Sequence, residues 1–467
     1  MENGYFKLTW RQRIGFSAGD LAQNLIYQTV SIWLLFFYTN VYGLAPASSA
    51  VMFLVVRIID VIWDPVVGAF IDKANPPWGK YRSWLLFAGF PLAGFAILCF
   101  WNGFSGSLLY AYITYVGMSM CFTLINVPYG ALNSSLTRDT DEITILTSVR
   151  MLFANLAGLI IKTLPLVIAI FAPKAYNETT GRMEAVYNTP EAAPAWFITM
   201  SIFALVGLAL LIFCFVESKE RIVMDADETS EVKVSDLWME LVRNKPLRVL
   251  SIFFIVAFTT MSISNAADSY FMTYNINASP LMTTAFMWMG TIPAFIFLPL
   301  VPAIKKKIGK AGMFRMFLGI SIVGMIIMYI VVSIPSLKTC FPLLCLIQFI
   351  KSAGVLVATG YMWALVPEVV TYGEYQTGRR VAAIVNAIIC IFMKAGMALG
   401  GVIPGLVLSW VGFNSASQNQ SPLAEQGILW LVTLIPAVLF FVAIFVIGKY
   451  ELSDERMDEI NMEISKR

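Results

Sequence analysis

The feature that most constrains this chain is the recurrence of apolar segments long enough to cross a lipid bilayer. They lie at about 14–40, 46–71, 83–101, 107–135, 146–172, 195–217, 247–273, 281–303, 313–333, 339–366, 381–410 and 427–448. Because a bilayer core of ~30 Å requires about 20 apolar helical residues, each segment predicts one membrane-spanning helix. The 467 residues are therefore expected to fold as an all-α membrane protein with twelve transmembrane helices.

The composition agrees with this prediction and excludes several other classes of protein. Hydrophobic residues make up 58% of the chain and charged residues 13%, and the mean hydropathy is +0.74. A chain of this kind has too little polar surface to cover a soluble domain. There is no histidine, so proton chemistry is left to carboxylates, and the six cysteines form no CxxC motif. We expect no cofactor, no metal centre beyond a possible Na⁺, and no nucleic-acid partner.

The basic residues predict the orientation in the membrane. With twelve spans both termini lie on one side, and that side receives nearly all of the lysines and arginines. The opposite loops hold only Lys174, Arg182 and Lys338. The positive-inside rule then makes the basic side, with both termini, cytoplasmic. The first apolar run is too long for a cleavable signal peptide, so a multi-pass protein of the cell (inner or cytoplasmic) membrane is expected.

A charged stretch divides the chain into two halves. The predicted organisation is an N-terminal six-helix bundle at 1–217, a cytoplasmic inter-domain loop at 218–246, a C-terminal six-helix bundle at 247–448 and a cytoplasmic tail at 449–467. Residues 235–243 and 453–464 have apolar residues at helical spacing, which predicts two surface helices. Short basic loops at 72–82 and 303–310 occupy corresponding places in the two halves, a weak repeat typical of two-domain secondary transporters.

Two aspartates inside the second apolar segment are the main candidates for an ion site. Asp60 and Asp64 are four residues apart, so a helix places both on one face. A carboxylate at membrane depth costs about 2.5–3.5 kcal/mol on insertion scales, so two on one face indicate a coupling-ion site of a solute transporter. Arg57 precedes Asp60 by three residues and is a candidate partner. Trp63 lies between the carboxylates, and its apolar ring could dehydrate them and favour protonation.

Further charged residues lie within the apolar segments, namely Asp20, Arg150, Lys162, Asp268, Lys351 and Lys394, and of these Lys162 and Asp268 are candidates for coupling or cavity positions. Asp20 fits an interfacial position equally well, and Lys351 is best interpreted as a structural partner or a snorkelling side chain. Lys394 lies deeper, where a lysine usually faces a water-filled cavity or a carboxylate. Gly396 and Gly400 in the same segment are interpreted as close-packing positions between helices.

The fourth segment contains a polar group of its own. Thr123 and Asn126 are three residues apart and share one helical face. Pro128 interrupts the backbone hydrogen bonding, and a carbonyl freed in this way could bind a cation. An ordinary kink with satisfied polar groups is the alternative interpretation.

Short motifs occur in order along nearly the whole chain. They are Gly19-Asp20, Phe36 to Asn40, Arg57 to Pro65, Trp78 to Arg82, Asn126 to Gly130, Arg150, Trp363 to Glu368, Tyr372 to Tyr375, Gly378-Arg379 and Lys394 to Gly396. Together they resemble the glycoside–pentoside–hexuronide:cation symporters, the sugar transporters related to melibiose permease, and most closely the glucuronide-carrier branch. This resemblance implies the major facilitator fold, in which two six-helix bundles rock around a central cavity.

The resemblance also implies roles for individual residues. Asp60 and Asp64 match the cation-site carboxylates, with Thr123 as a supporting ligand. The substrate-binding positions are matched by Asp20, Asn126, Arg150 and Lys394.

Two departures from melibiose permease bear on specificity. Asn126 replaces a second sugar-binding aspartate, so the cavity loses one negative charge and should accept an anionic sugar more readily. Trp63 replaces a polar residue, which favours protons over sodium as the coupling ion.

The sequence therefore predicts a symporter and no enzyme. It is expected to import a sugar or glycoside, with a glucuronide or other hexuronide as a candidate, together with H⁺ or alternatively Na⁺. Its partners are the solute, the coupling cation and the lipid bilayer, and it is expected to act as a monomer. Two alternatives remain: a lipid or lysolipid transporter of the same fold, and a membrane sugar sensor without transport. No nucleophile motif accompanies the aspartates, which argues against an enzyme.

Overall fold

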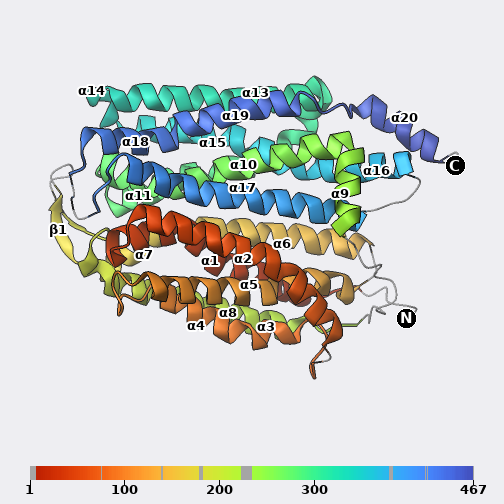
Figure 1. The fold of residues 1–467 in the computed structure, drawn as a ribbon, viewed down its shortest axis with the longest axis horizontal. Coiled ribbons are helices and arrows are strands. Elements are labelled where there is room, and N and C mark those ends of the chain that lie inside the picture. Colours follow the sequence, from red (N-terminus) through yellow and green to blue (C-terminus); the bar gives the residue numbers. More distant parts are fainter. Residues whose placement is uncertain are drawn as a thin grey trace. The chain divides into compact units, whose positions relative to one another are not determined.

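The computed structural model describes residues 7–74, 76–137, 140–177, 182–221, 234–377, 382–415, 417 and 419–465. These residues group into two compact units, which are coloured from red to yellow and from green to blue in Figure 1. The first comprises residues 1–230 with the short pieces 279–284 and 415–417, and the second comprises the remainder. We describe each unit by itself.

The N-terminal unit consists of helices and one short hairpin. Its elements are α1 (Trp10–Phe37, extended by a π-helical turn Tyr38–Tyr42), α2 (Pro46–Lys73), α3 (Ser83–Phe87), α4 (Gly89–Cys99), α5 (Leu108–Leu136), α6 (Thr140–Ile161), α7 (Leu164–Phe171), β1 (Lys174–Asn177), β2 (Arg182–Ala185), a 3₁₀ turn (Pro190–Ala192) and α8 (Ala193–Glu217). The antiparallel hairpin β1–β2 pairs Lys174 with Ala185, and no pattern in the sequence predicted it.

Helix α1 is the central element of this unit, because it packs against both α6 and α8. Its first turn is fixed by a capping box, in which the Thr9 hydroxyl accepts from the backbone N–H of Gln12 and the Gln12 side chain binds back. Buried aromatic rings also pack in this unit. Among them, Phe100 stacks on Trp196 with the ring centroids 5.9 Å apart. Helix α2 packs against α5, and this contact carries the candidate ion site.

The regular elements in the described residues of the C-terminal unit are all helices. Its elements are α9 (Val234–Arg243), α10 (Lys245–Tyr270, extended by a π-helical turn Phe271–Asn275), α11 (Pro280–Met289), α12 (Ile292–Phe297), a 3₁₀ turn (Leu298–Leu300), α13 (Val301–Ser333), α14 (Pro335–Lys338), α15 (Phe341–Met362), a 3₁₀ turn (Trp363–Leu365), α16 (Val366–Thr377), α17 (Ala382–Trp410), α18 (Pro422–Val432), α19 (Leu434–Ile447) and α20 (Asp454–Ser465). The first residues of α11 group with the N-terminal unit.

Two glycines let α17 approach α10 closely. A Cβ added at Gly396 would lie 2.6 Å from the Ile255 carbonyl oxygen, and one at Gly400 would lie 2.6 Å from the Thr259 carbonyl oxygen. Neither contact tolerates a side chain, so the close-packing interpretation of this pair is confirmed. The order of the contacts also shows that the two helices run parallel.

The described helices include eight that are long and apolar enough to cross a membrane, or nine if a pair bent by 43° between α6 and α7 is one span. Helices α1 and α2, of 28 residues each, are not among these eight, and both carry charged residues in their interior. The predicted span at 83–101 is divided at Ala88 into α3 and α4.

Three further predicted spans are each divided into two helices. The divisions lie at Lys162–Thr163, Gly290–Thr291 and Thr433. A proline follows each division within the next helix, at Pro165, Pro293 and Pro436. Proline lacks the N–H that would continue the hydrogen-bond ladder and disfavours helical geometry at the residue before it, so it is tolerated at the start of a new helix.

Two surface segments behave as the sequence predicts. Residues 234–243 form α9, and the tail forms α20, which packs Met457 and Ile460 against a group that includes Tyr372 and Tyr375 of α16.

The loop between α2 and α3 is anchored by a carboxylate that follows α8. Glu220 accepts hydrogen bonds from the backbone N–H groups of Lys80 (3.0 Å), Tyr81 (2.7 Å) and Arg82 (2.8 Å). Gly79 has a φ of +123°, and a Cβ there would lie 2.7 Å from Glu220. The loop can therefore close around this carboxylate only with glycine at position 79.

Candidate functional site

The candidate ion site is built where α2 packs against α5. Asp60, which is 5% exposed, accepts a hydrogen bond of 2.5 Å from the Ser119 hydroxyl and pairs with Arg57 at 3.2 Å. Arg57 also donates to the Tyr27 hydroxyl at 2.6 Å. The expected pairing of Arg57 with Asp60 is therefore present, and the carboxylate and guanidinium each have a second partner.

The second carboxylate of the site lies one turn further along α2. Thr123 donates to Asp64 at 3.2 Å, and Trp63 donates from Nε1 to the backbone carbonyl of Met120 at 3.3 Å. Ser119 and Thr123 are four residues apart on α5, as Asp60 and Asp64 are on α2. Each carboxylate thus faces a hydroxyl of the neighbouring helix. Carboxylate and hydroxyl oxygens suit hard cations, and the carboxylates can also take up protons.

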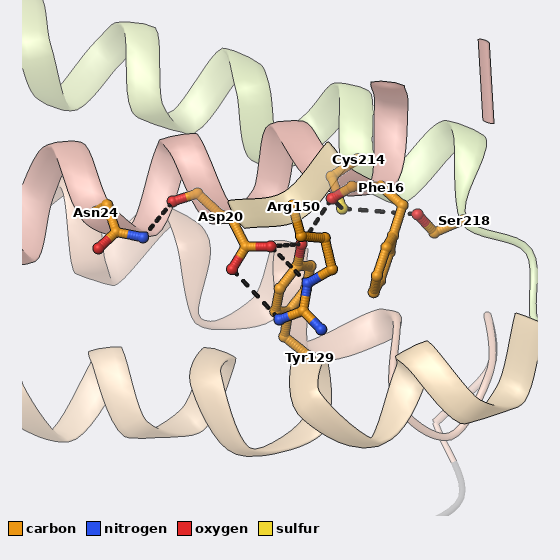
Figure 2. Close-up of polar contacts among 7 residues, drawn as sticks. All are labelled: Phe16, Asp20, Asn24, Tyr129, Arg150, Cys214 and Ser218. Atoms are coloured by element: carbon orange, nitrogen blue, oxygen red, sulfur yellow. Dashed lines mark hydrogen bonds and ion pairs between the residues drawn. The ribbon is translucent and has the colours of Figure 1, made fainter. Parts of the chain in front are cut away.

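The substrate candidates Asp20 and Arg150 form a second cluster, which Figure 2 shows. Arg150 of α6 reaches both oxygens of Asp20 on α1, with Nε 2.6 Å from Oδ2 and a terminal nitrogen 3.3 Å from Oδ1. The Tyr129 hydroxyl of α5 lies 2.8 Å from Asp20 Oδ2 and 2.7 Å from the Phe16 carbonyl oxygen. The guanidinium also lies over the Phe16 and Tyr129 rings. The two opposite charges therefore compensate each other within the N-terminal unit.

The remaining predicted positions are distributed over both units. Asn126 is exposed on α5, although Thr123 one turn earlier is buried. Lys162 lies at the bend between α6 and α7. Lys394 is half-buried in the middle of α17 and Asp268 is buried near the end of α10, both in the C-terminal unit. Gly378 and Arg379 lie outside the described residues.

The structure also brings in residues that the sequence analysis did not select. The position of Ser119, four residues before Thr123, is a signal that could have identified it. Tyr129 lies inside the motif Asn126 to Gly130, which the sequence offers only as part of the family resemblance. Tyr27 and Gln348, which contacts Asp268, lie in apolar segments with no distinguishing pattern. Polar partners of this kind are revealed by helix packing and carry no local signal.

Comparison with known proteins identifies the family. The family model described as "MFS/sugar transport protein" matches residues 15–454. The chain belongs to this family. The "Uncharacterized symporter YnaJ" of Bacillus subtilis (strain 168) is 43% identical over 465 residues, which cover 99% of this chain and 96% of that protein. The "Glucuronide carrier protein homolog" of Escherichia coli (strain K12) is 30% identical over 99% of this chain and 96% of its own length.

The solved structures agree on the fold of this family member. The nucleoside transporter NupG matches with a TM-score of 0.62 at 13% identity, over 94% of this chain and 100% of that one. The chain is accordingly a multi-pass membrane transporter of the major facilitator superfamily, of the sugar and glycoside symporter type, and it is no enzyme. This agrees with the family resemblance of its motifs.

Proposed function

We propose that this transporter imports a sugar or glycoside together with a cation, by alternating access in the inner cell membrane. In this proposal twelve spans form two six-helix bundles, divided as the charged stretch predicts, with both termini cytoplasmic. The protein is proposed to act as a monomer. The names of its relatives, which include symporters and a glucuronide carrier homolog, support a solute of this class.

The coupling ion is proposed to bind at Asp60 and Asp64, with Thr123 and Ser119 as supporting hydroxyls. The observation that carries this assignment is that each buried or half-buried carboxylate faces a hydroxyl from α5. Ion binding neutralises these charges, and a neutral site is cheaper to carry through a closed state than a bare one. Coupling must be reciprocal, so bound solute should raise the affinity for the ion by the same factor.

Protons are the proposed coupling ion, with Na⁺ as the alternative. Trp63 lies between the two carboxylates in the sequence of α2, and its indole N–H donates to the Met120 carbonyl. An apolar ring with no free polar group adds no ligand for Na⁺ and disfavours the charged carboxylate.

The solute is proposed to bind at Asp20, Asn126, Arg150 and Lys394, and to be a glucuronide or another hexuronide. Asp20 and Arg150 together offer charged acceptors and donors suited to sugar hydroxyls. The proposed preference for an anionic sugar rests on Asn126, which is neutral where melibiose permease has a second aspartate, with Arg150 and Lys394 retained. Asp20 compensates the charge of Arg150, so the loss of the second aspartate is the change that favours an anionic solute.

Uptake into proteoliposomes tests this function directly. Purified protein is reconstituted, and a proton gradient and a sodium gradient are imposed separately while a panel of glycosides is supplied. The comparison that matters is a glucuronide against its neutral glucoside. Faster uptake of the glucuronide supports the hexuronide proposal, and equal rates contradict it. Transport of a lysolipid without any glycoside would favour the other solute class.

The ion site is tested by Asp64→Asn in the same assay. This variant should abolish gradient-driven accumulation while leaving exchange of solute across the membrane. Asp458→Asn, in the surface helix α20, is the matched control and should accumulate solute normally. Full accumulation by Asp64→Asn would show that the ion site is elsewhere.

A further inference from the structure

A second buried charge pair lies in the C-terminal unit and takes no part in the proposed mechanism. Asp268 of α10 is 9% exposed, and Lys351 and Gln348 of α15 are each 2% exposed. The Gln348 amide donates from Nε2 to Asp268 Oδ2 at 3.1 Å. Lys351 Nζ lies 4.0 Å from Asp268 Oδ1 and 3.5 Å from the Val432 carbonyl oxygen. The lysine is therefore an ionic neighbour of the carboxylate without a direct hydrogen bond to it.

The Gln348 side chain makes this arrangement unusual for a purely structural pair. Its oxygen Oε1 is buried and accepts no hydrogen bond from the described residues. A buried acceptor without a donor costs about 1–3 kcal/mol, so an arrangement that retains one needs a compensating role. The same amide group already binds the carboxylate through its nitrogen.

A carboxylic acid and a primary amide are complementary when both hydrogen bonds form. The acid O–H donates to the amide oxygen, and the amide N–H donates to the other acid oxygen. The ionised carboxylate can accept only the N–H and leaves Oε1 unsatisfied. Exchanging the amide oxygen and nitrogen would bring two oxygens to 3.1 Å, which also requires a proton between them. Both orientations of Gln348 are thus better satisfied when Asp268 carries a proton.

We propose that Asp268 is a second proton-binding carboxylate of this transporter, stabilised in its protonated form by the Gln348 amide. The proton comes from water, bonds to Asp268 Oδ1 and is donated in a hydrogen bond to Gln348 Oε1, while Nε2 continues to donate to Oδ2. Lys351 keeps its own proton and its contact with the Val432 carbonyl. The combined charge of Asp268, Gln348 and Lys351 rises by one unit. Both hydrogen bonds between the Asp268 carboxyl group and the Gln348 amide are then formed. This proposal does not depend on the identity of the solute.

The charged groups of the other elements packed on α10 lie elsewhere. Helices α9 and α16 meet the start of α10, where Asn244 binds Glu240 and the Val369 carbonyl, about 24 residues or ~36 Å before Asp268. Glu368 of α16 is paired with Lys310 at 2.7 Å.

The charged groups of α17 and α18, which also pack on α10, are either distant from Asp268 or paired with another residue. Lys394 precedes Gly396, which packs at Ile255, so it lies roughly 20 Å along the helix axis from Asp268. Glu425 of α18 pairs with Lys338 at 3.5 Å, and α19 carries no charged residue. Lys351 is a charged side chain that lies against Asp268, with Nζ 4.0 Å from Oδ1.

Infrared spectroscopy of the purified protein in lipid nanodiscs tests this proposal without any solute. The carbonyl stretch of protonated carboxyl groups is recorded as the pH is lowered. We expect a band that is absent in Asp268→Asn and retained in Asp64→Asn. In Gln348→Leu the band should shift, and proton binding should weaken about tenfold because the protonated acid loses two hydrogen bonds to the amide whereas the ionised carboxylate loses one. Gln426→Leu is the matched control, because Gln426 binds only the neutral Tyr329 hydroxyl at 2.8 Å among its described contacts.

A charge-neutral double variant separates proton binding from a structural role. Asp268→Asn leaves Lys351 uncompensated and is expected to lower stability, whereas Asp268→Asn with Lys351→Gln removes both charges. The double variant should fold and bind solute while lacking the band. A spectrum of either Asp268 variant identical to that of the wild type would overturn the proposal, and so would an unchanged band in Gln348→Leu. If the wild type fails to take up solute, the proposed function is contradicted, whereas the proposal for Asp268 is not affected.

Discussion

Arg57–Asp60 in one unit and Asp268–Lys351 in the other are buried charge pairs whose hydrogen bonds are satisfied to different extents. Asp60 binds Arg57 at 3.2 Å and Ser119 at 2.5 Å, and Arg57 binds Tyr27 at 2.6 Å. Lys351 lies 4.0 Å from Asp268, with one weak backbone contact at 3.5 Å. Desolvation penalises both pairs, but only the first recovers the cost through several short hydrogen bonds.

This difference indicates what each pair can do. The cation of the first pair is an arginine, which remains protonated in proteins, so Asp60 always has a fixed positive neighbour. The cation of the second pair is a lysine held at a distance, beside an amide that prefers a protonated acid. Arg57 therefore keeps a fixed positive charge beside the proposed ion site, whereas the surroundings of Asp268 favour a change of its charge by proton binding.

The largest expected effect is on folding stability and separates the two pairs. Asp60→Asn leaves the Arg57 guanidinium buried without a carboxylate, which should cost about 3–5 kcal/mol of unfolding free energy. Lys351→Met should cost less, because the remaining Asp268 can be neutralised by a proton. Thermal unfolding of both variants in one detergent measures the difference. The double variant Asp60→Asn with Arg57→Gln should recover part of the loss, and equal losses in the two single variants would remove the distinction between the pairs.

The second prediction tests whether the region around the Asp268–Lys351 pair is loosely packed. A Cβ at Gly354, three residues after Lys351, would lie 2.0 Å from the Phe317 carbonyl oxygen of α13. Gly354→Ala should therefore force α15 away from α13 and lower stability by about 1–3 kcal/mol. Gly319→Ala on α13 is the control, since its Cβ would meet nothing within 4 Å. If Gly354→Ala leaves the stability in thermal unfolding unchanged, the packing around Lys351 can relax.

The third prediction uses the hydroxyls of the ion site to distinguish the coupling ions. Thr123→Val removes the donor that binds Asp64 at 3.2 Å. If Na⁺ is the ion, one ligand is lost and the half-saturating concentration should rise about tenfold. If H⁺ is the ion, the charged carboxylate loses stabilisation, and proton affinity should increase by a similar factor. Transport measured against ion concentration gives the sign, and Thr123→Ser, which keeps the hydroxyl, should behave as the wild type.

The smallest effect is expected at the surface, where the charges of α20 are largely solvated. Asp454 binds Lys305 at 2.9 Å and Lys310 at 3.0 Å. Partial burial raises the pKa of Asp454, but the two lysines outweigh it and hold that pKa below its usual value. Its stabilising contribution is thus complete above the unfolded pKa of about 3.9 and is lost as the pH falls through the lower, folded value.

Hydrogen exchange of α20 measures this pH dependence. Protection should be constant from about pH 5 to 8 and should fall below about pH 4. Asp454→Asn should reduce protection slightly at neutral pH and remove the part of the change due to this carboxylate. Arg456→Ala, which breaks only the exposed pair with Glu459, should have little effect at any pH. A loss of protection already at pH 6 would show that another group controls the docking.

The sequence predicted those features that depend on local spacing. The Asp60–Asp64 interval placed both carboxylates on one face, and the apolar pattern of residues 453–464 predicted the helix that packs on α16. The close approach at Gly396 and Gly400 was also predicted correctly. These patterns repeat within a few turns of one helix, so no knowledge of the neighbouring helices was needed.

Features that depend on packing could not be predicted in the same way. Lys351 was assigned to a structural role, and Asp268 was selected without a partner, because 83 residues separate the two members of the pair. Asp20 and Arg150 were selected separately, and their 2.6 Å contact could not be predicted because 130 residues separate them. The divided helices were missed because hydrophobicity extends across Pro165, Pro293 and Pro436 even where the backbone ladder does not.

The anchoring of the α2–α3 loop by Glu220 has a practical consequence for experiments with this transporter. Lys80 and Arg82 would ordinarily invite cleavage by trypsin, yet their backbone amides are bound to a carboxylate and cannot readily adopt the extended form that a protease requires. Limited digestion should therefore spare these two sites in the native protein and cut them once Glu220 is replaced by glutamine. The loop can serve as a built-in reporter of whether a purified preparation retains its native arrangement.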